Sequence, residues 1–427
     1  MTVEDRLRAT TEALSGVMRE VPPLALPAER PGRVSRPPAP RRWRGWLIPL
    51  TAAVAVIAVA ATLVAVRDSR DATPAPPAPT ANPLASAIPR YYVQLDADNA
   101  TAPGYQRDAI VGDSHTGKVV ATVKPPAGLT FAGVAGAADD RTFALDATSD
   151  TAATQANHSA AGTHTWYLLR IAPGTPRPAT LTRLPIAWPT DSDQIDGMAL
   201  SLRAGMLAIF CHTGALGGSN GPFALRTFSL RTGKALRTWT APAGKVYVFG
   251  AGDMDNAVGL TWTADGRTLA FMLTPFAWPY DERTLNVARK GTSLLTDSRL
   301  VLAVPGDQRT CASLLLASDG RTMVCGTLGN LNRGCRQREP EFDQYSSATG
   351  KLTRVLYRYQ GTCQSATAEV VWTGASGTAI GVIDAYRYQQ NRVIIDDKVG
   401  LLTPGKFTPL HVPVPAGYGF TTGELAF

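Results

Sequence analysis

The segment Trp262-Thr263-Ala264-Asp265-Gly266-Arg267-Thr268-Leu269-Ala270-Phe271 decides the fold of this chain. It has the pattern of an apolar strand, a tight Asp-Gly turn and a second apolar strand, because glycine supplies the positive φ that such a turn requires. A close copy is Leu316-Ala317-Ser318-Asp319-Gly320-Arg321-Thr322-Met323-Val324-Cys325, and looser copies lie near residues 140, 205 and 377. The repeat therefore predicts five hairpins of one kind, the inner hairpins.

A second kind of hairpin alternates with the first. Its turns are Thr-Gly-Lys at residues 116–118, 232–234 and 349–351, a Pro-Gly-Lys variant at 404–406, and weaker signals near Gly174 and Asp297. Six outer hairpins thus accompany five inner ones. A propeller of four-stranded blades needs one of each per blade. The two chain ends, Tyr91–Leu95 and Gly423–Phe427, are therefore expected to form the sixth inner pair and to hide both open edges.

In these Asp-Gly-Arg-x-hydrophobic units, residues 90–427 resemble the TolB-type, WD-repeat-like β-propellers. The resemblance implies an all-β domain, with six blades as the count that best fits the hairpins. It implies little about function, because one fold supports many activities. A seven-bladed ring and an array of β-sandwiches are the alternatives.

An uncharged apolar segment precedes this domain. Residues 46–66 are nearly all Ala, Val, Leu or Ile, and about 20 such residues span a bilayer as a helix. Upstream lie Arg30, Arg33, Arg36, Arg41, Arg42 and Arg44, whereas the two arginines directly downstream are balanced by aspartates. The positive-inside rule therefore predicts a cytoplasmic N-terminus and an extracytoplasmic C-terminal domain. A cleaved signal peptide is the alternative, but the leader is long for one.

The predicted organisation has four parts: a cytoplasmic tail (1–45), a single transmembrane helix acting as a signal-anchor (46–66), a Pro/Ala-rich linker (67–89) and the extracytoplasmic propeller (90–427). Within the tail, residues 3–20 have apolar side chains at helical spacing and predict a short amphipathic helix. Such a helix is suited to docking on a cytoplasmic protein.

The charge of the chain argues against nucleic acid as a partner. The formal net charge is +8, about half of it in the tail, and a nucleic-acid footprint needs clustered Lys and Arg. Arg outnumbers Lys 34 to 8, which is typical of a GC-rich bacterial genome such as an actinobacterial one.

No arrangement of residues predicts catalysis, a metal or a cofactor. The histidines lack metal-ligand spacing; they are His115, His158, His164, His212 and His411. The closest local pair of carboxylates, Asp253 and Asp255, fits a solvated loop. Residues 112–118 and 217–221 are spelled almost like a phosphate-binding loop and a nucleophile elbow, but neither is followed by an expected helix.

The cysteines predict disulfides. Cys311, Cys325, Cys335 and Cys363 lie close together along the chain, and Cys211 lies apart. Disulfides can form outside the cytoplasmic membrane. We therefore expect two bridges among the four, with the pairing left open, and a buried, reduced Cys211.

The longest loops are expected between the second and third strands of the blades, all at one end of the ring. They are predicted at Asp146–Thr165, Cys211–Phe223, Leu273–Ser293, Gly326–Glu341 and Asp384–Asn391. Loops on a rigid scaffold commonly carry recognition, and aromatic and Arg side chains are favoured at binding hot spots. The candidate binding residues are therefore Phe276, Trp278, Tyr280, Arg283, Arg333, Arg336 and Arg338. The alternative is that Phe276 and Trp278 cap their own blade.

Three functions are compatible with this organisation. The favoured one is an extracytoplasmic binding or sensor module for a protein, peptide or glycan. The second is a transmembrane regulator whose tail binds a cytoplasmic partner. Its single-pass layout is similar to membrane-bound regulators of extracytoplasmic-function sigma factors, although the tail lacks their longer helical bundle and zinc motif. The third is a propeller enzyme such as a glycan lyase or hydrolase, which needs clustered acids or histidines that the sequence does not show.

Overall fold

The computed structural model describes residues 88–96, 107–149, 163–188, 193–213, 222–242, 246–247, 259–275, 280–304, 311–327, 339–361, 365–389, 392–413 and 424–427. The chain separates into two compact units, Met1–Ala78 and Pro79–Phe427, and every described residue belongs to the second. The predicted tail and membrane segment, and most of the linker, lie outside the described residues. No helix within the described ranges is long and apolar enough to cross a membrane.

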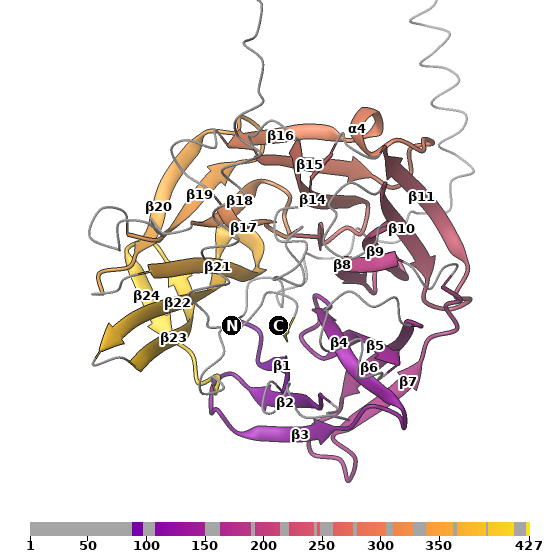
Figure 1. Cartoon of the computed structure of the whole chain (residues 1–427), viewed down its shortest axis with the longest axis horizontal. Coiled ribbons are helices and arrows are strands. Elements are labelled where there is room, and N and C mark those ends of the chain that lie inside the picture. The colour runs from indigo at the N-terminus through magenta and orange to yellow at the C-terminus, as the bar shows by residue number, and fades with distance from the viewer. Residues whose placement is uncertain are drawn as a thin grey trace, which may run out of the picture. The chain divides into compact units, whose positions relative to one another are not determined.

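Six antiparallel sheets arranged in a ring form the blades of a β-propeller (Figure 1). From the centre outward, the first blade consists of β25 (Leu425–Ala426), β1 (Tyr91–Leu95), β2 (Ala109–Asp113) and β3 (Val119–Val123). The second has β4 (Leu129–Gly136), β5 (Thr142–Ser149), β6 (Thr165–Ile171) and β7 (Ala179–Arg183). The third has β8 (Asp193–Ser201), β9 (Met206–Thr213), β10 (Phe223–Ser229) and β11 (Ala235–Ala241).

The remaining blades continue the same order. The fourth has a split inner strand, β12 (Val246–Tyr247) and β13 (Thr261–Trp262), followed by β14 (Thr268–Pro275), β15 (Tyr280–Asn286) and β16 (Arg299–Val304). The fifth has β17 (Cys311–Leu316), β18 (Thr322–Thr327), β19 (Glu341–Ser346) and β20 (Leu352–Arg358). The sixth has β21 (Ser365–Thr373), β22 (Ala379–Gln389), β23 (Arg392–Thr403) and β24 (Lys406–Pro409).

The ring closes as the hairpin count predicts. β25, near the C-terminus, pairs with β1, placing Ala426 opposite Val93 and Leu425 opposite Gln94. Leu425 and Phe427 pack with Tyr92 against the sixth blade. The prediction of six blades is therefore confirmed, and the seven-bladed and sandwich alternatives are excluded.

The predicted turns are also confirmed, with one difference. Glycines with positive φ stand in the outer hairpins at residues 117, 174, 233, 350 and 405, and in the inner ones at 205, 266, 320 and 377; Asp140 has a φ of 54° in the remaining inner turn. The turn expected near Asp297 is instead a short helix, α4 (Leu294–Asp297). Ser293 caps this helix by accepting the Thr296 amide, while its own amide donates to the Asp297 carboxylate.

The two ends of the ring differ. Because neighbouring strands are antiparallel, all inner and outer hairpins lie at one end, here called the hairpin face. Hydrogen bonds connect these turns, from the Ala264 amide to the Ser318 carbonyl and from the Ser347 hydroxyl to the Gly320 carbonyl. The connections between second and third strands lie at the other end, the loop face. The connections between blades start there but pass against the outer hairpin of the next blade, as Pro185 does at Gly233 and His411 at Ser114.

Two of the predicted long loops are wrong in extent. The segment Leu273–Ser293 contains β15, whose Asp281 pairs with Leu273 of β14. The segment Asp384–Asn391 belongs mostly to a long hairpin in which Gln389 pairs with Arg392. In both segments the backbone groups of charged and polar residues form hydrogen bonds with a neighbouring strand. The polarity of these segments was therefore not a reliable sign of a loop.

Candidate functional site

The predicted binding residues are only partly within the described chain. Phe276, Trp278, Arg333, Arg336 and Arg338 lie outside it. Tyr280 is the first residue of β15 and pairs with Val304.

Arg283, also on β15, is 14% exposed. Its guanidinium donates to the Leu295 carbonyl at 3.1 Å, to the Ser298 hydroxyl at 3.2 Å and to the Asp281 carboxylate at 3.2 Å. Arg283 therefore braces the segment around α4, between the third and fourth strands of its blade.

The second blade contains a buried His–Asp pair. Asp146 lies on β5 and His164 directly precedes β6, so the sheet brings together residues 18 positions apart. The His164 Nδ1 atom lies 3.0 and 2.9 Å from the two Asp146 carboxylate oxygens. The imidazole stacks on Trp166, and Trp188 packs against both rings.

The third blade contains a second pair of the same kind. His212, near the loop-face end of β9, has its Nδ1 atom 2.9 and 2.8 Å from the two carboxylate oxygens of Asp196 on β8. A β-bulge between Ile195 and Gly197 holds Asp196. Both side chains are almost fully buried, and the His212 ring packs on Phe223.

An aspartate beside Nδ1 determines the chemistry of each imidazole. Because an ionised carboxylate only accepts hydrogen bonds, Nδ1 is the donor beside it and Nε2 is the acceptor of a neutral ring. The same arrangement orients histidines that act as bases or ligands in other proteins. Within the described ranges, however, no group of three or more His, Cys, Asp or Glu has the geometry of a metal site.

The sixth blade contains a pair of acids on one sheet face. Glu369 is on the inner strand β21, and Asp384 is on β22 opposite Thr367. Thr367 and Glu369 are two residues apart, so both acids point from the same side of the blade. Val382, opposite Glu369, packs with Tyr92 and Leu425. The acids therefore lie toward the junction with the first blade.

Burial raises the pKa of Glu369 to about 8, and the negative charge of Asp384 adds to this rise. A carboxyl group that stays protonated near neutral pH beside a second carboxyl can donate as well as accept a proton. Strongly shifted acids of this kind are concentrated at functional sites.

A further buried acid lies on the fourth blade. Glu282 of β15 is fully buried, and neither of its carboxylate oxygens has a hydrogen-bond partner in the described part of the chain. Burial raises its pKa well above the ordinary value. Glu282 lies opposite Met272, which packs against the fifth blade.

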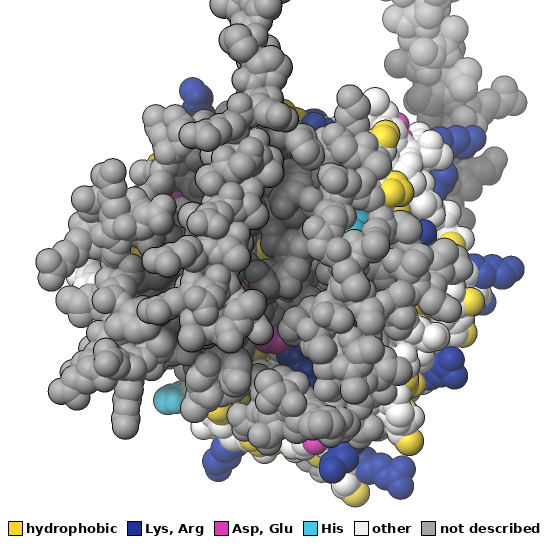
Figure 2. All heavy atoms as spheres, viewed as in Figure 1, with side chains coloured by type: hydrophobic (Ala, Val, Ile, Leu, Met, Phe, Trp, Pro, Cys, Tyr) yellow, Lys and Arg dark blue, Asp and Glu magenta, His cyan; other side chains and the backbone are white. Residues whose placement is uncertain are grey.

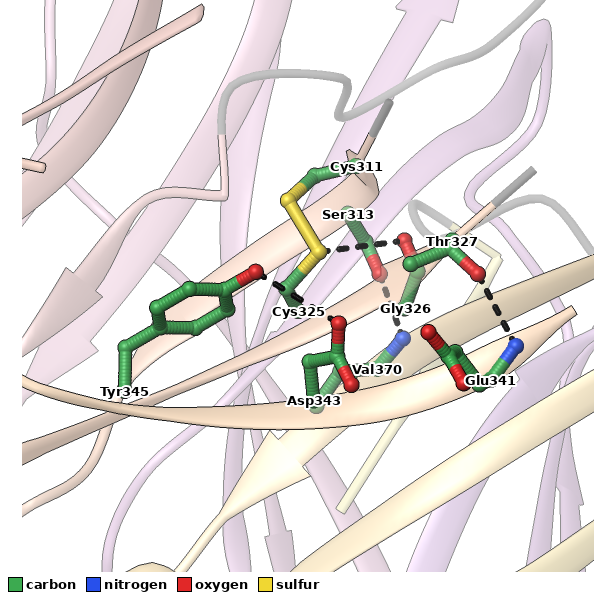
Figure 3. The surroundings of a disulfide bond; sticks show 9 residues. All are labelled: Cys311, Ser313, Cys325, Gly326, Thr327, Glu341, Asp343, Tyr345 and Val370. Carbon is green, nitrogen blue, oxygen red and sulfur yellow. Dashed lines mark hydrogen bonds between the residues drawn. A yellow bond between two sulfur atoms is a disulfide. The ribbon is translucent and has the colours of Figure 1, made fainter. Parts of the chain in front are cut away.

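One of the predicted disulfides is present. Cys311 of β17 and Cys325 of β18 are joined, with their Cα atoms 5.5 Å apart (Figure 3). Cys325 lies opposite Asp343, whose carboxylate accepts the Tyr345 hydroxyl at 3.4 Å. Cys335 and Cys363 lie outside the described residues. Cys211 is buried in β9, with Sγ 3.5 Å from the Ala224 carbonyl oxygen.

The bridge lies beside the junction of two blades. In Figure 3 the Ser313 hydroxyl, next to the disulfide, accepts the backbone amide of Val370 from the sixth blade. On the outer side, the Thr327 hydroxyl accepts the Glu341 amide at 2.9 Å. These hydrogen bonds attach the inner strands of the fifth blade to their neighbours.

These groups were not recognisable from the sequence alone. His164 and His212 were noted only as scattered histidines, and Glu369, Asp384 and Glu282 not at all. A signal did exist: each of these three acids stands inside a strand, and charged residues are rarely buried without a specific reason.

No protein-family model matches the sequence, and no curated protein is significantly similar to it. Among solved structures the chain is similar to an oligogalacturonate lyase in complex with manganese, with 10% identity, a TM-score of 0.39 and coverage of 71% of this chain and 72% of that one. It is also similar to TolB from Acinetobacter baumannii, with 11% identity, a TM-score of 0.38 and coverage of 79% and 66%.

A third similar structure is the β-propeller domain of the Trilobed protease from Pyrococcus furiosus, with 10% identity, a TM-score of 0.31 and coverage of 51% of this chain and 56% of that one. This chain thus spans slightly less than two thirds of TolB and little more than half of the protease domain. These similarities concern the fold.

Proposed function

We propose that this chain is a membrane-anchored extracytoplasmic binding module whose ligand contacts the loop face of the propeller. The observation that carries the proposal is the set of buried ionisable groups between the blades: two histidines oriented by aspartate, and the Glu369–Asp384 pair. Blades that pack only apolar side chains against each other would be simpler to fold, because burying an ionisable group is costly unless the group is paired. Retaining such groups is typical of a site that serves a ligand.

The chemistry of these groups suggests the class of ligand. The Nε2 atom of an Asp-oriented histidine accepts a hydrogen bond, as an ionised carboxylate does, and the protonated Glu369 carboxyl can also donate one. A matching ligand donates hydrogen bonds and tolerates negative charge, as amines and sugar hydroxyls do. We therefore favour a glycan or an amine-bearing peptide over an anionic ligand.

Ligand binding is tested on the full chain in lipid nanodiscs by thermal unfolding with spermidine and with N-acetylglucosamine oligomers. Binding to the folded state alone raises the Tm as ligand is added. We expect one of the two probes to raise the Tm, and we expect Glu369→Gln or His212→Gln to make this rise smaller. The matched control is Lys406→Gln on the hairpin face, which should leave the rise in Tm unchanged. An equal shift in all variants would contradict a loop-face site.

The anchoring is tested separately. Protease added to intact spheroplasts should digest residues 90–427 and spare the tail, whereas protection of the propeller would contradict the topology. Recovery of a sigma factor with residues 1–45 would favour the regulator, in which the propeller senses outside and the tail signals inside.

A further inference from the structure

The start of the propeller is attached to the hairpin face. The Arg90 guanidinium donates to Asp113 in the outer hairpin of the first blade, and the Arg90 amide donates to Asp140 in the inner hairpin of the second. The Ser114 hydroxyl donates to the Pro89 carbonyl. Residues 89 and 90 are therefore fastened between two turns, and the linker predicted from the sequence is joined to the chain at this face.

The turns of the hairpin face are basic. Exposed lysines end four of the outer hairpins, at Lys118, Lys234, Lys351 and Lys406. Exposed arginines stand in four of the inner hairpins, at Arg141, Arg203, Arg267 and Arg321. Four of the outer turns and four of the inner turns thus carry an exposed basic side chain, although Arg141 also lies 3.8 Å from the Asp140 carboxylate.

The acids among these turns have structural partners. Asp139, Asp265 and Asp319 each accept the backbone amide two residues further on and so close their own turns. Asp113 is paired with Arg90. These acids hold the turns in shape, while the lysines of the outer hairpins project into solvent.

Exposed aliphatic side chains accompany the basic ones. Val119, Leu236, Leu300 and Leu352 are 56, 44, 46 and 43% exposed. Each is the first or second residue of the outermost strand of its blade, beside the outer hairpin, and has a basic residue next to it: Lys118, Arg237, Arg299 or Lys351. At the right-hand and lower edges of the view in Figure 2, Lys and Arg side chains stand among hydrophobic ones.

A surface that combines basic and aliphatic side chains fits an anionic lipid bilayer. The basic groups are attracted to phospholipid headgroups, and the aliphatic ones enter the boundary between headgroups and acyl chains. A soluble polyanion would use the charges but leave the aliphatic side chains in water. We propose that the hairpin face docks on the anionic phospholipid surface of the membrane in which the chain is anchored, so that the loop face points away from the lipid.

This inference rests on the proposed anchoring, and its test uses the full chain in nanodiscs. An amine-acylating reagent modifies exposed lysines, and mass spectrometry follows each one in bilayers of phosphatidylcholine alone and in bilayers rich in phosphatidylglycerol. In the anionic bilayer we expect modification of Lys118, Lys234 and Lys351 to slow by about fivefold or more. High salt should abolish the difference, because it screens exposed charges.

The chain provides a matched internal control. Lys124 is exposed and lies at the opposite end of β3 from Lys118, toward the loop face. Its modification should be equal in both bilayers. The triple variant Lys118→Glu/Lys234→Glu/Lys351→Glu should also remove the protection of Lys406, whereas Lys124→Glu should keep it.

Several outcomes would overturn the inference. Equal modification of Lys118 in both bilayers, or equal protection of Lys124, would show that the hairpin face does not dock. Protection by soluble polyphosphate but not by the anionic bilayer would identify a soluble polyanion as the partner. Extraction of the chain from vesicles by alkaline carbonate would contradict the anchoring itself. Carbonate-resistant anchoring without lysine protection would leave the proposed function standing and overturn only the docking.

Discussion

Glu282 and its neighbour Asp281 are both buried in the fourth blade, on opposite faces of the sheet, and within the described part of the chain only Asp281 has a cationic partner, Arg283. Replacing Glu282 with Met should raise the free energy of unfolding at neutral pH by about 1–3 kcal/mol, because a buried polar group without a partner is destabilising. Asp281→Met should lower it, since Arg283 loses an acceptor. Denaturant unfolding measures both, and a destabilising Glu282→Met would contradict the absence of a partner.

The acid pair of the sixth blade predicts a pH dependence of stability. The pKa of Glu369 in the folded protein, about 8, lies above its ordinary value of 4.5. The folded state therefore binds the proton more tightly than the unfolded state. The stability that comes from protonated Glu369 is complete below the ordinary pKa. It decreases as the pH rises and is lost above about pH 8.

Glu369→Gln should remove this dependence, because the amide stays neutral. Relative to the variant, the wild type should lose stability by up to about 1.4 kcal/mol per pH unit within that window. Unfolding measured from acidic to mildly alkaline pH checks this, with the exposed Glu339→Gln as control. Parallel pH profiles for wild type and Glu369→Gln would show that Glu369 is ionised when folded.

Among the secondary-structure elements, the outer hairpins allow a comparison of two glycines. Gly174 and Gly233 both have positive φ, but a Cβ atom at Gly174 would meet nothing within 4 Å, whereas one at Gly233 would lie 1.8 Å from the Pro185 carbonyl oxygen. Gly174→Ala should therefore lower stability by only the ~1–2 kcal/mol of a left-handed alanine. Gly233→Ala should lower it clearly more, because the backbone of the second blade must move. Equal losses in thermal unfolding would contradict this close packing.

The disulfide of the fifth blade joins its two inner strands over a sequence separation of 14 residues. Cys311→Ala/Cys325→Ala should lower the free energy of unfolding by about 3 kcal/mol, because the unfolded chain is no longer restricted. Addition of reductant should lower the free energy of unfolding of the wild type towards that of the variant, and it should leave the value for the variant unchanged. No difference between the two proteins would contradict the bridge.

For the whole molecule, stability should depend on ring closure. Leu425 is 1% exposed and joins the first blade to the sixth, whereas Leu352, on an outermost strand, is 43% exposed. Leu425→Asp should lower stability by at least about 3 kcal/mol because a buried leucine is replaced by a charge, and removal of Gly423–Phe427 should do so because the edge pairing is lost as well. Leu352→Asp is the control and should change it by less than about 0.5 kcal/mol. An unchanged melting temperature for Leu425→Asp would mean that the ring does not depend on this strand.

The sequence by itself determined the hairpins, their number and the closure of the ring. Turns such as Asp319-Gly320 need positive φ, a local property that glycine reveals without knowledge of the rest of the chain. Counting inner and outer hairpins then left one inner pair to be made, and the chain ends had strand character. The disulfide was predictable as a bridge but not as the Cys311–Cys325 pair, because pairing depends on strand register.

Only the tertiary structure decided which polar groups meet. Asp384 lies near Glu369, and His212 near Asp196, because antiparallel register places residues that are 15 or 16 positions apart on one sheet face. Arg283 faces α4 for the same reason. Alternation along a strand tells which residues share a face, but not which blade that face packs against, so the buried acids, the histidine pairs and the two unlike ends of the ring emerged only when the sheets were assembled.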